Sequence, residues 1–197
     1  EREEGALEVL LAQPIARRSL VLGKFAGLGA ALAIALFGGF GGAGLVIATA
    51  GADMAAGGYL LLVLRSLGLG LAFISLGLWL ASVSATRLRA LTWGLLLWFG
   101  SVLLYDLLVV GATALFGGAA LKGALGLLLV ANPVDLVRIA ALIQLGGADS
   151  FGLTAQALIG FLRGPAGSAL LTLALLAWIV VPLLGAVRAF DRRDFAA

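Results

Sequence analysis

The chain has 197 residues, of which 62% are hydrophobic and 12% are charged, and its mean hydropathy is +1.16. This composition leaves too little polar surface for a soluble domain of that length, so it predicts an integral membrane protein. Because the sequence has no Cys and no His, it excludes thiolate nucleophiles, imidazole bases and Cys/His metal cages. The 13 basic and 10 acidic side chains of such a chain mainly set its orientation in the membrane, so we expect no nucleic-acid partner.

Residues 1–24 form a charged, amphipathic segment before the first long apolar run. At helical spacing, Leu7 and Leu11 form an apolar stripe, and beside it lies an acidic stripe of Glu1, Glu4 and Glu8. Pro14 ends this predicted helix. Three cations follow where they would hold the chain at an anionic membrane surface: Arg17, Arg18 and Lys24. Amphipathicity alone indicates an interfacial helix that lies on the membrane.

Four apolar runs are long enough to cross a hydrocarbon core of about 30 Å, which takes about 20 helical residues. They are residues 25–50, 59–83, 91–116 and 169–187. The sequence therefore predicts an all-α fold, a polytopic transmembrane helical bundle that forms a single domain. Small residues within the runs, such as Gly70 and Gly77, would let these helices approach one another closely.

Two charged side chains fall inside these runs. Arg65 lies about two turns into the second run, and Asp106 lies in the middle of the third. Measured along straight helices from the same membrane face, their depths are roughly 9 Å and 15 Å, close enough for a pair. An isolated charge in lipid is costly, so both should face the bundle or an aqueous cavity. They are either structural, as a pair or as snorkelling side chains, or part of a proton or substrate path.

Residues 117–168 differ from the spans, because their apolar pieces are short and are interrupted by Gly and Pro. Asn132, Pro133 and Asp135 predict a helix start, since Asn caps well, Pro suits the first helical position and an acid suits the first turn. Arg138 lies three residues after Asp135, within reach of its side chain. These four residues mark the start of a short helix outside the regular spans.

A second short helix is predicted over residues 150–163, where Gly164 and Pro165 end it. We interpret the whole block 117–168 as an outer-side cap of short helices, in which a re-entrant arrangement shielded by the other helices is one form. The alternative is a further span over residues 121–145.

The distribution of Lys and Arg favours four spans with both ends of the chain cytoplasmic, in the inner (plasma) membrane. In that orientation nine basic residues lie inside: Arg2, Arg17, Arg18, Lys24, Arg87, Arg89, Arg188, Arg192 and Arg193. Three lie outside: Lys122, Arg138 and Arg163. A further span over residues 121–145 would move the tail 188–197 outside and reduce the ratio to about seven against four.

Residues 3–25 resemble the cytoplasmic coupling segment of ABC type 2 exporter permeases. The matching letters are EEGALEVLLAQPIAR at residues 3–17 and VLGKF at residues 21–25. In that superfamily such a stretch follows the second transmembrane helix and contacts the ATPase subunit. The letters NPVDLVRI at residues 132–139 and FDRRD at residues 190–194 resemble permeases of multicopper-enzyme maturation, such as that of nitrous oxide reductase.

The resemblance implies a contact with a cytoplasmic ABC ATPase through Glu3, Glu4, Leu7, Glu8, Leu11, Gln13, Pro14 and Arg17. ATP and Mg²⁺ are then expected on that partner, with no cofactor or metal bound by this chain. It also implies a homodimer of permease copies and a periplasmic accessory protein. The chain starts at Glu1 without a Met, and we expect an N-terminal truncation that removed two of six spans.

The expected function is that of the transmembrane permease subunit of an ATP-driven exporter, with no catalysis of its own. Gly23 and Lys24 lack the upstream glycine and the Ser/Thr of a phosphate loop. Soft ligands are nearly absent, with Met54 alone, so a role in copper-enzyme maturation would be indirect. The alternatives are a generic exporter of a drug, lipid or peptide and, in another class, a non-transporting membrane scaffold.

Overall fold

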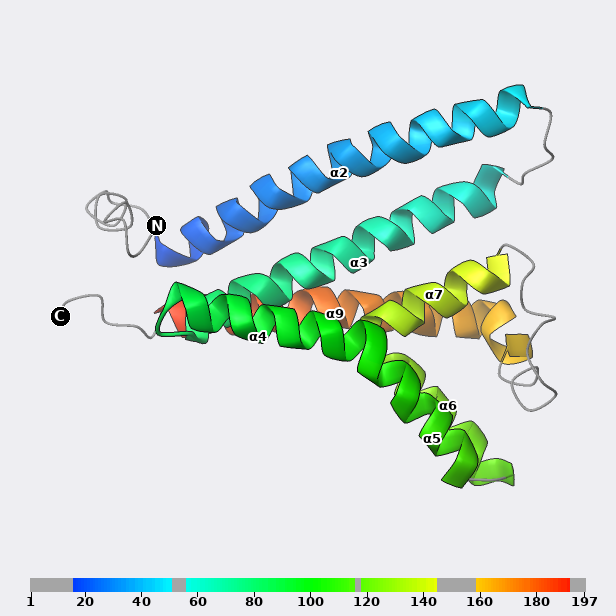
Figure 1. Ribbon diagram of the computed structural model, residues 1–197. Helices are drawn as coiled ribbons and strands as arrows, with labels where there is room; N and C mark the ends of the chain where they lie inside the picture. Colours follow the sequence, from blue (N-terminus) through cyan, green and yellow to red (C-terminus); the bar gives the residue numbers. More distant parts are fainter. Residues whose placement is uncertain (1–15, 51–55, 116–117, 145–158, 192–197) are drawn as a thin grey trace.

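The computed structural model describes residues 16–50, 56–115, 118–144 and 159–191, and these ranges are helical apart from short breaks (Figure 1). The elements are α2 (Arg17–Thr49), α3 (Ala56–Val83), α4 (Arg87–Phe99), the π-helical turn η1 (Gly100–Leu104), α5 (Tyr105–Leu115), α6 (Gly118–Ala131), α7 (Pro133–Gln144) and α9 (Pro165–Asp191). The predicted all-α fold is confirmed.

Within the described ranges, four helical stretches are long and apolar enough to cross a membrane: Arg18–Thr49, Ala56–Val83, Arg87–Gly111 and Pro165–Asp191. They match the four predicted apolar runs, so the chain is a multi-pass membrane protein. α2 begins at Arg17 rather than at residue 25, because the charged residues before the apolar run are helical too. Hydropathy marks the hydrocarbon boundary, whereas the helix continues past it into the polar region.

The central helix of the bundle is α3, which packs along its length on α9 and also contacts α2, α7 and α4 (Figure 1). α3 and α9 run parallel to each other. Arg65 hydrogen-bonds to Ser168 near the start of α9, and the indole of Trp79 packs on Gly185 near its end. The long α3–α9 contact is therefore the frame on which the other helices are placed.

Two buried apolar clusters tie the helices together. One joins the first two turns of α2 to the last two turns of α9 and consists of Val21, Ala186 and Phe190. The other joins α6, α7, the helical turn 159–163 and α9, and its members are Leu129, Leu136, Val137, Ala140, Leu162, Leu171, Ala174 and Leu175. We call the end where α2 begins and α9 ends the proximal end, and the end where α3 and α9 begin the distal end.

Glycines allow the closest helix contacts on α3. A Cβ added to Gly70 would lie 2.4 Å from the Leu32 side chain of α2, and one added to Gly68 would lie 2.6 Å from Leu175 of α9. Gly77, on the same helix, has nothing within 4 Å of such a Cβ. Of the two glycines expected to permit close packing, Gly70 does so and Gly77 does not within the described chain.

The third span departs from the straight helix that hydropathy predicts. α4, η1 and α5 form one continuous helical path, but α5 diverges from α3 and α9 after η1 (Figure 1). A π-helical turn inserts an extra residue into the helix, and such turns are a recognised cause of bends. The membrane depth estimated for Asp106 along a straight helix is consequently wrong, because Asp106 follows this turn.

The block predicted as a cap of short helices contains α6 and α7, which meet at an angle of 111° between Leu125–Ala131 and Pro133–Gln144. The sharp turn excludes a straight span over residues 121–145 and leaves a broken span or a re-entrant loop there. Helical residues 159–163 agree with the end of the second predicted helix, whereas its predicted start near residue 150 lies outside the described residues. Gly164 then breaks the helix, and α9 begins at Pro165.

Gly167 should tolerate no side chain. A Cβ there would lie 2.4 Å from both the Phe161 carbonyl oxygen and the Leu162 Cα, which are backbone atoms that cannot rotate away. We expect Gly167→Ala to lower the free energy of unfolding by about 1–3 kcal/mol through overpacking, measured by denaturant titration in detergent. Gly160→Ala is the matched control, because nothing lies within 4 Å of its added Cβ. A Gly167→Ala protein as stable as this control would contradict the packing described for the start of α9.

Candidate functional site

A cluster of polar side chains lies where the third span bends and α6 turns into α7. The turn is organised by Asn132, which is only 2% exposed. Its Oδ1 accepts a hydrogen bond from the Val134 N–H at 3.0 Å, so it caps α7 as the sequence predicted. Pro133 follows as the first helical residue, and Asp135 lies in the first turn. The predicted helix start is confirmed in each of these respects.

The same Asn132 side chain also reaches across to the third span. Its Nδ2 donates to the carbonyl oxygen of Ser101, within η1, at 2.7 Å. The Ser101 hydroxyl donates to the Leu97 carbonyl at 2.8 Å, one turn earlier. A single amide therefore connects the start of α7 with the π-helical turn, and the bend in the third span and the α6–α7 turn are fixed in one place.

Arg138 is the charged centre of this cluster. Its Nη1 lies 2.7 Å from Asp106 Oδ1 and 3.1 Å from Asp135 Oδ1. The contact with Asp135 is the predicted one, three residues apart on α7. The contact with Asp106 takes the place of a pair between Asp106 and Arg65, which was one of the alternatives open from the sequence. It forms because α7 packs on η1, the turn that leads into α5. Arg65 instead hydrogen-bonds to Ser168 on α9.

Two further side chains hold the last turn of α6, and sequence reasoning gave them no such role. The hydroxyl of Tyr105 donates to the Leu128 carbonyl at 2.6 Å, and the indole N–H of Trp178 donates to the Val130 carbonyl at 2.9 Å. Both carbonyls belong to the last four residues of α6, which have no partner within their own helix. Tyr105 could have been found from the sequence, because it adjoins the intramembrane charge Asp106. Nothing in the sequence around Trp178 indicates its contact with α6.

The polar cluster lies deep along the bundle. Trp178 is the fourteenth of the 27 residues of α9, so its bond to Val130 places the α6–α7 turn halfway along that helix. Half the helix length corresponds to about 20 Å. The block expected to cap the outer side therefore reaches inward to mid-height, which agrees with the re-entrant form of that prediction.

The side chains of Arg138 and Asp106 are 40% and 49% exposed, whereas that of Asp135 is 11% exposed. An ion pair facing hydrocarbon at mid-height would be costly. The exposed side of this pair should consequently face water or another protein chain rather than lipid. This arrangement suits a polar path or an interface. Within the described ranges, no group of three or more carboxylates is placed to hold a metal ion.

At the proximal end, a groove of about 690 Å³ lies between α2, α3 and α4 and is closed by Phe190 of α9. Its walls are mostly apolar, and Lys24 and Arg87 contribute the charged side chains. The groove lies beside the start of α2, the helix that follows residues 1–15 in the sequence. Seven of the predicted ATPase-coupling residues lie outside the described residues: Glu3, Glu4, Leu7, Glu8, Leu11, Gln13 and Pro14. The eighth, Arg17, is the first residue of α2.

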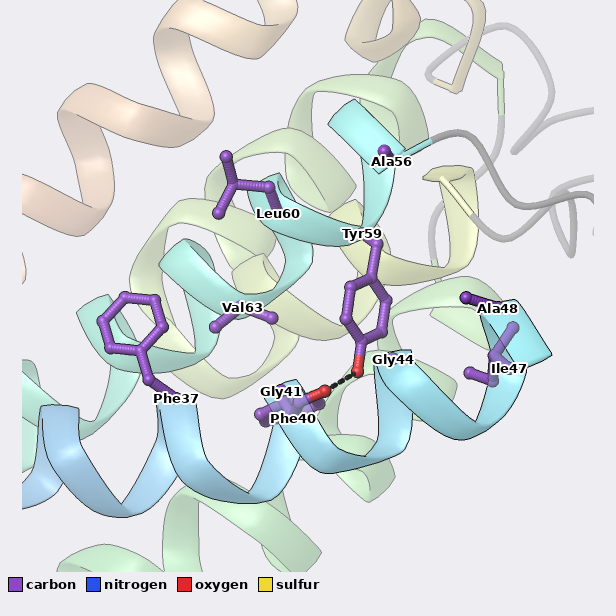
Figure 2. A pocket seen from close by; sticks show the side chains of 10 residues that line it. All are labelled: Phe37, Phe40, Gly41, Gly44, Ile47, Ala48, Ala56, Tyr59, Leu60 and Val63. Carbon is purple, nitrogen blue, oxygen red and sulfur yellow. Dashed lines mark hydrogen bonds between the residues drawn. The ribbon is translucent and has the colours of Figure 1, made fainter.

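At the distal end, a smaller cavity of about 350 Å³ lies between α2 and α3 (Figure 2). The Tyr59 hydroxyl donates to the Phe40 carbonyl across it, and the two rings meet edge to face with centroids 6.2 Å apart. Gly44 leaves room for the Tyr59 ring, since an added Cβ would lie 3.0 Å from it. The cavity is lined by residues of α2 and α3, and apart from Tyr59 these residues are apolar.

Comparison with known proteins gives a family match over almost the whole chain. The profile of the ABC-2 family transporter proteins matches residues 1–195. The chain is 35% identical over 197 residues to the probable ABC transporter permease protein NosY of Stutzerimonas stutzeri, covering 98% of this chain and 70% of that protein. It is 38% identical over 154 residues to the protein of the same name from Pseudomonas aeruginosa, covering 76% of this chain and 55% of that protein.

The Asn132 side chain makes three hydrogen bonds, with the Val134 N–H, the Ser101 carbonyl and, at 3.4 Å, Asp135 Oδ2, so its loss should cost more than the loss of an ordinary helix cap. Asn132→Ala removes the cap of α7 and the bond to the Ser101 carbonyl, and we expect it to lower the free energy of unfolding by about 1–3 kcal/mol. Thr86→Ala is the control, because the Thr86 hydroxyl caps α4 by accepting from the Arg89 N–H on an exposed turn, and the structure gives that hydroxyl no second hydrogen bond. Circular dichroism during denaturant titration measures both. Equal losses would show that the link to η1 adds nothing.

Proposed function

This chain belongs to the ABC-2 family of transporter proteins as a multi-pass membrane permease, and we propose that it couples ATP hydrolysis by a separate cytoplasmic ATPase to movement at its polar cluster. The observation that carries this proposal is that α9 contacts both regions. Its Phe190 packs with Val21 at the proximal end, and its Trp178 bonds to the α6–α7 turn at mid-height. One helix therefore connects the region where an ATPase would dock with the region where polar groups meet.

The coupling segment would be the amphipathic stretch that leads into α2. We propose that Glu4 and Glu8 meet basic groups of the ATPase and that Leu7 and Leu11 fill its groove. Pro14 would fix the joint to α2, which begins at Arg17. Because the start of α2 packs on the end of α9 through one buried cluster, a displacement of this segment would also move α9. In this orientation the proximal end is cytoplasmic, as the distribution of Lys and Arg favours.

Movement within the membrane would use two irregular places in the helices. Pro182 lies inside α9 between Trp178 and Phe190, and a proline removes one hydrogen bond of the helix. The π-helical turn η1 gives the third span a second flexible point. Tilting α9 at Pro182 would move Trp178, the α6–α7 turn and, through Asn132, the bend at η1. Such a transition is a helix shift that opens or closes the polar cluster.

We also propose a role in copper-enzyme maturation, which the resemblance at residues 132–139 supports. With no Cys or His and a single Met, the chain offers no soft ligands for copper transfer. The permease would instead export a sulfur-containing or other species, or transmit force to a periplasmic protein docked on residues 117–168. In either case two permease copies would work with two ATPase subunits, and ATP with Mg²⁺ would bind to those subunits.

Charge reversal at Glu4 and Glu8 together should uncouple the complex. We expect ATP hydrolysis to continue while ATP-driven transport, or ATP-driven rearrangement of the permease, falls by roughly two- to thirtyfold, since both acids would now repel the ATPase. The assay uses the full complex in proteoliposomes. Arg89→Glu is the control, because it reverses an exposed charge on the first turn of α4 at the same end. Coupled activity that survives the Glu4 and Glu8 reversal would count against the docking proposed here.

Asp106→Asn should impair movement without preventing assembly. The variant removes the negative charge from the contact between α5 and α7, while Arg138 keeps its ion pair with Asp135 at 3.1 Å. We expect a loss of transport of roughly two- to thirtyfold, with the yield of assembled complex unchanged in size-exclusion chromatography. A parallel loss of folded protein would show that the pair is only structural.

A further inference from the structure

Arg65 is a buried cation in the distal half of the bundle. It is the tenth residue of α3, about 14 Å from the distal end of that helix by the helical rise. The residue is only 8% exposed. A snorkelling arginine extends its guanidinium to the membrane surface, where it would be exposed. The burial of Arg65 excludes snorkelling, which was one of the structural explanations open from the sequence.

The charge of Arg65 is not balanced by a carboxylate in the part of the chain that the structure describes. Its one hydrogen bond there runs from Nη2 to Ser168 Oγ and is long, at 3.4 Å. Arg138 provides a contrast within the same chain, because two carboxylates lie within 3.1 Å of its Nη1. A guanidinium has five N–H donors, so within the described ranges most of the donors of Arg65 have no protein acceptor.

The surroundings of Arg65 add positive potential instead of cancelling it. Ser168 lies in the first turn of α9, a helix of 27 residues, and the N-terminus of a helix carries a partial positive charge. Acidic residues occupy the first turn of α5, as Asp106, and of α7, as Asp135. The first turn of α9 has none. A buried cation aimed at the positive end of a helix is unfavourable unless an anion joins them.

We propose that Arg65 and Ser168, at the start of α9, form a binding site for an oxyanion. The planar guanidinium offers parallel N–H donors that match two oxygens of a phosphate, sulfate or carboxylate group, and the Ser168 hydroxyl offers another donor. The anion comes either from the phosphodiester of a membrane lipid or from a soluble molecule. The site requires neither an ATPase nor transport, so it stands or falls independently of the function proposed above.

Binding is tested on the full-length protein, purified in detergent and stripped of lipid. One arm titrates phosphatidylglycerol, with zwitterionic phosphatidylcholine as reference, and counts bound lipids by native mass spectrometry. The other arm titrates sodium sulfate against sodium chloride at equal ionic strength and follows the thermal unfolding midpoint. Saturable binding of phosphatidylglycerol alone identifies a lipid as the source, and a saturable shift with sulfate identifies a soluble oxyanion.

Arg65→Gln should weaken the binding that the wild type shows by about tenfold or more, because a charge-assisted bidentate contact is lost. Arg89→Gln is the matched control, since it removes the same charge from an exposed position at the proximal end, and it should bind like the wild type. If Arg65→Gln does not fold, Arg65→Lys and Ser168→Ala replace it, and each should weaken binding to a smaller extent. Wild-type protein that binds neither probe, or variants at both positions that bind as tightly as the wild type, would overturn the proposal.

Discussion

The side-chain amide of Asn132 is the contact on which the irregular half of this bundle depends. It caps α7 through the Val134 N–H and holds the carbonyl of Ser101 in the bent third span. Backbone groups at such a depth must be paired within the protein, because hydrocarbon offers them no partner. The ion pair between Arg138 and Asp106 crosses from α7 to α5 beside the same contact, whereas the pair between Arg138 and Asp135 lies within α7.

The sequence was sufficient to predict the features that are set locally. Apolar runs of span length gave the four long helices, and Asn132 with Pro133 gave the start of α7, because capping acts over three or four residues. The pair of Asp106 with Arg138 could not be found in that way, since 32 residues separate the two and their approach depends on the bend at η1. Pairing Asp106 with Arg65 failed because it assumed straight spans. The contact of Trp178 with Val130 joins residues 48 positions apart and had no local signal either.

The charged side chains of the spans fall into two settings with different physical consequences. Arg138 is partly exposed, and the two carboxylates paired with it more than balance its positive charge. Arg65 is buried and meets only a hydroxyl within the described chain, so it retains a net charge. α9 connects both settings to the proximal end, because it carries Ser168, Trp178 and Phe190 along one helix. A tilt of α9 would therefore change the surroundings of Arg65 and of Arg138 at the same time.

Transmission along α9 is tested most directly by a distance across the bundle. The chain has no Cys, so spin labels can be placed without background on Ile34 of α2 and Leu127 of α6, which are 75% and 76% exposed. Double electron–electron resonance on the complex, with and without a non-hydrolysable ATP analogue, should show a change in this distance. The change should disappear in Trp178→Phe, which lacks the indole N–H that bonds to Val130. An unchanged distance in the wild type, or a change that persists in Trp178→Phe, would contradict transmission through α9.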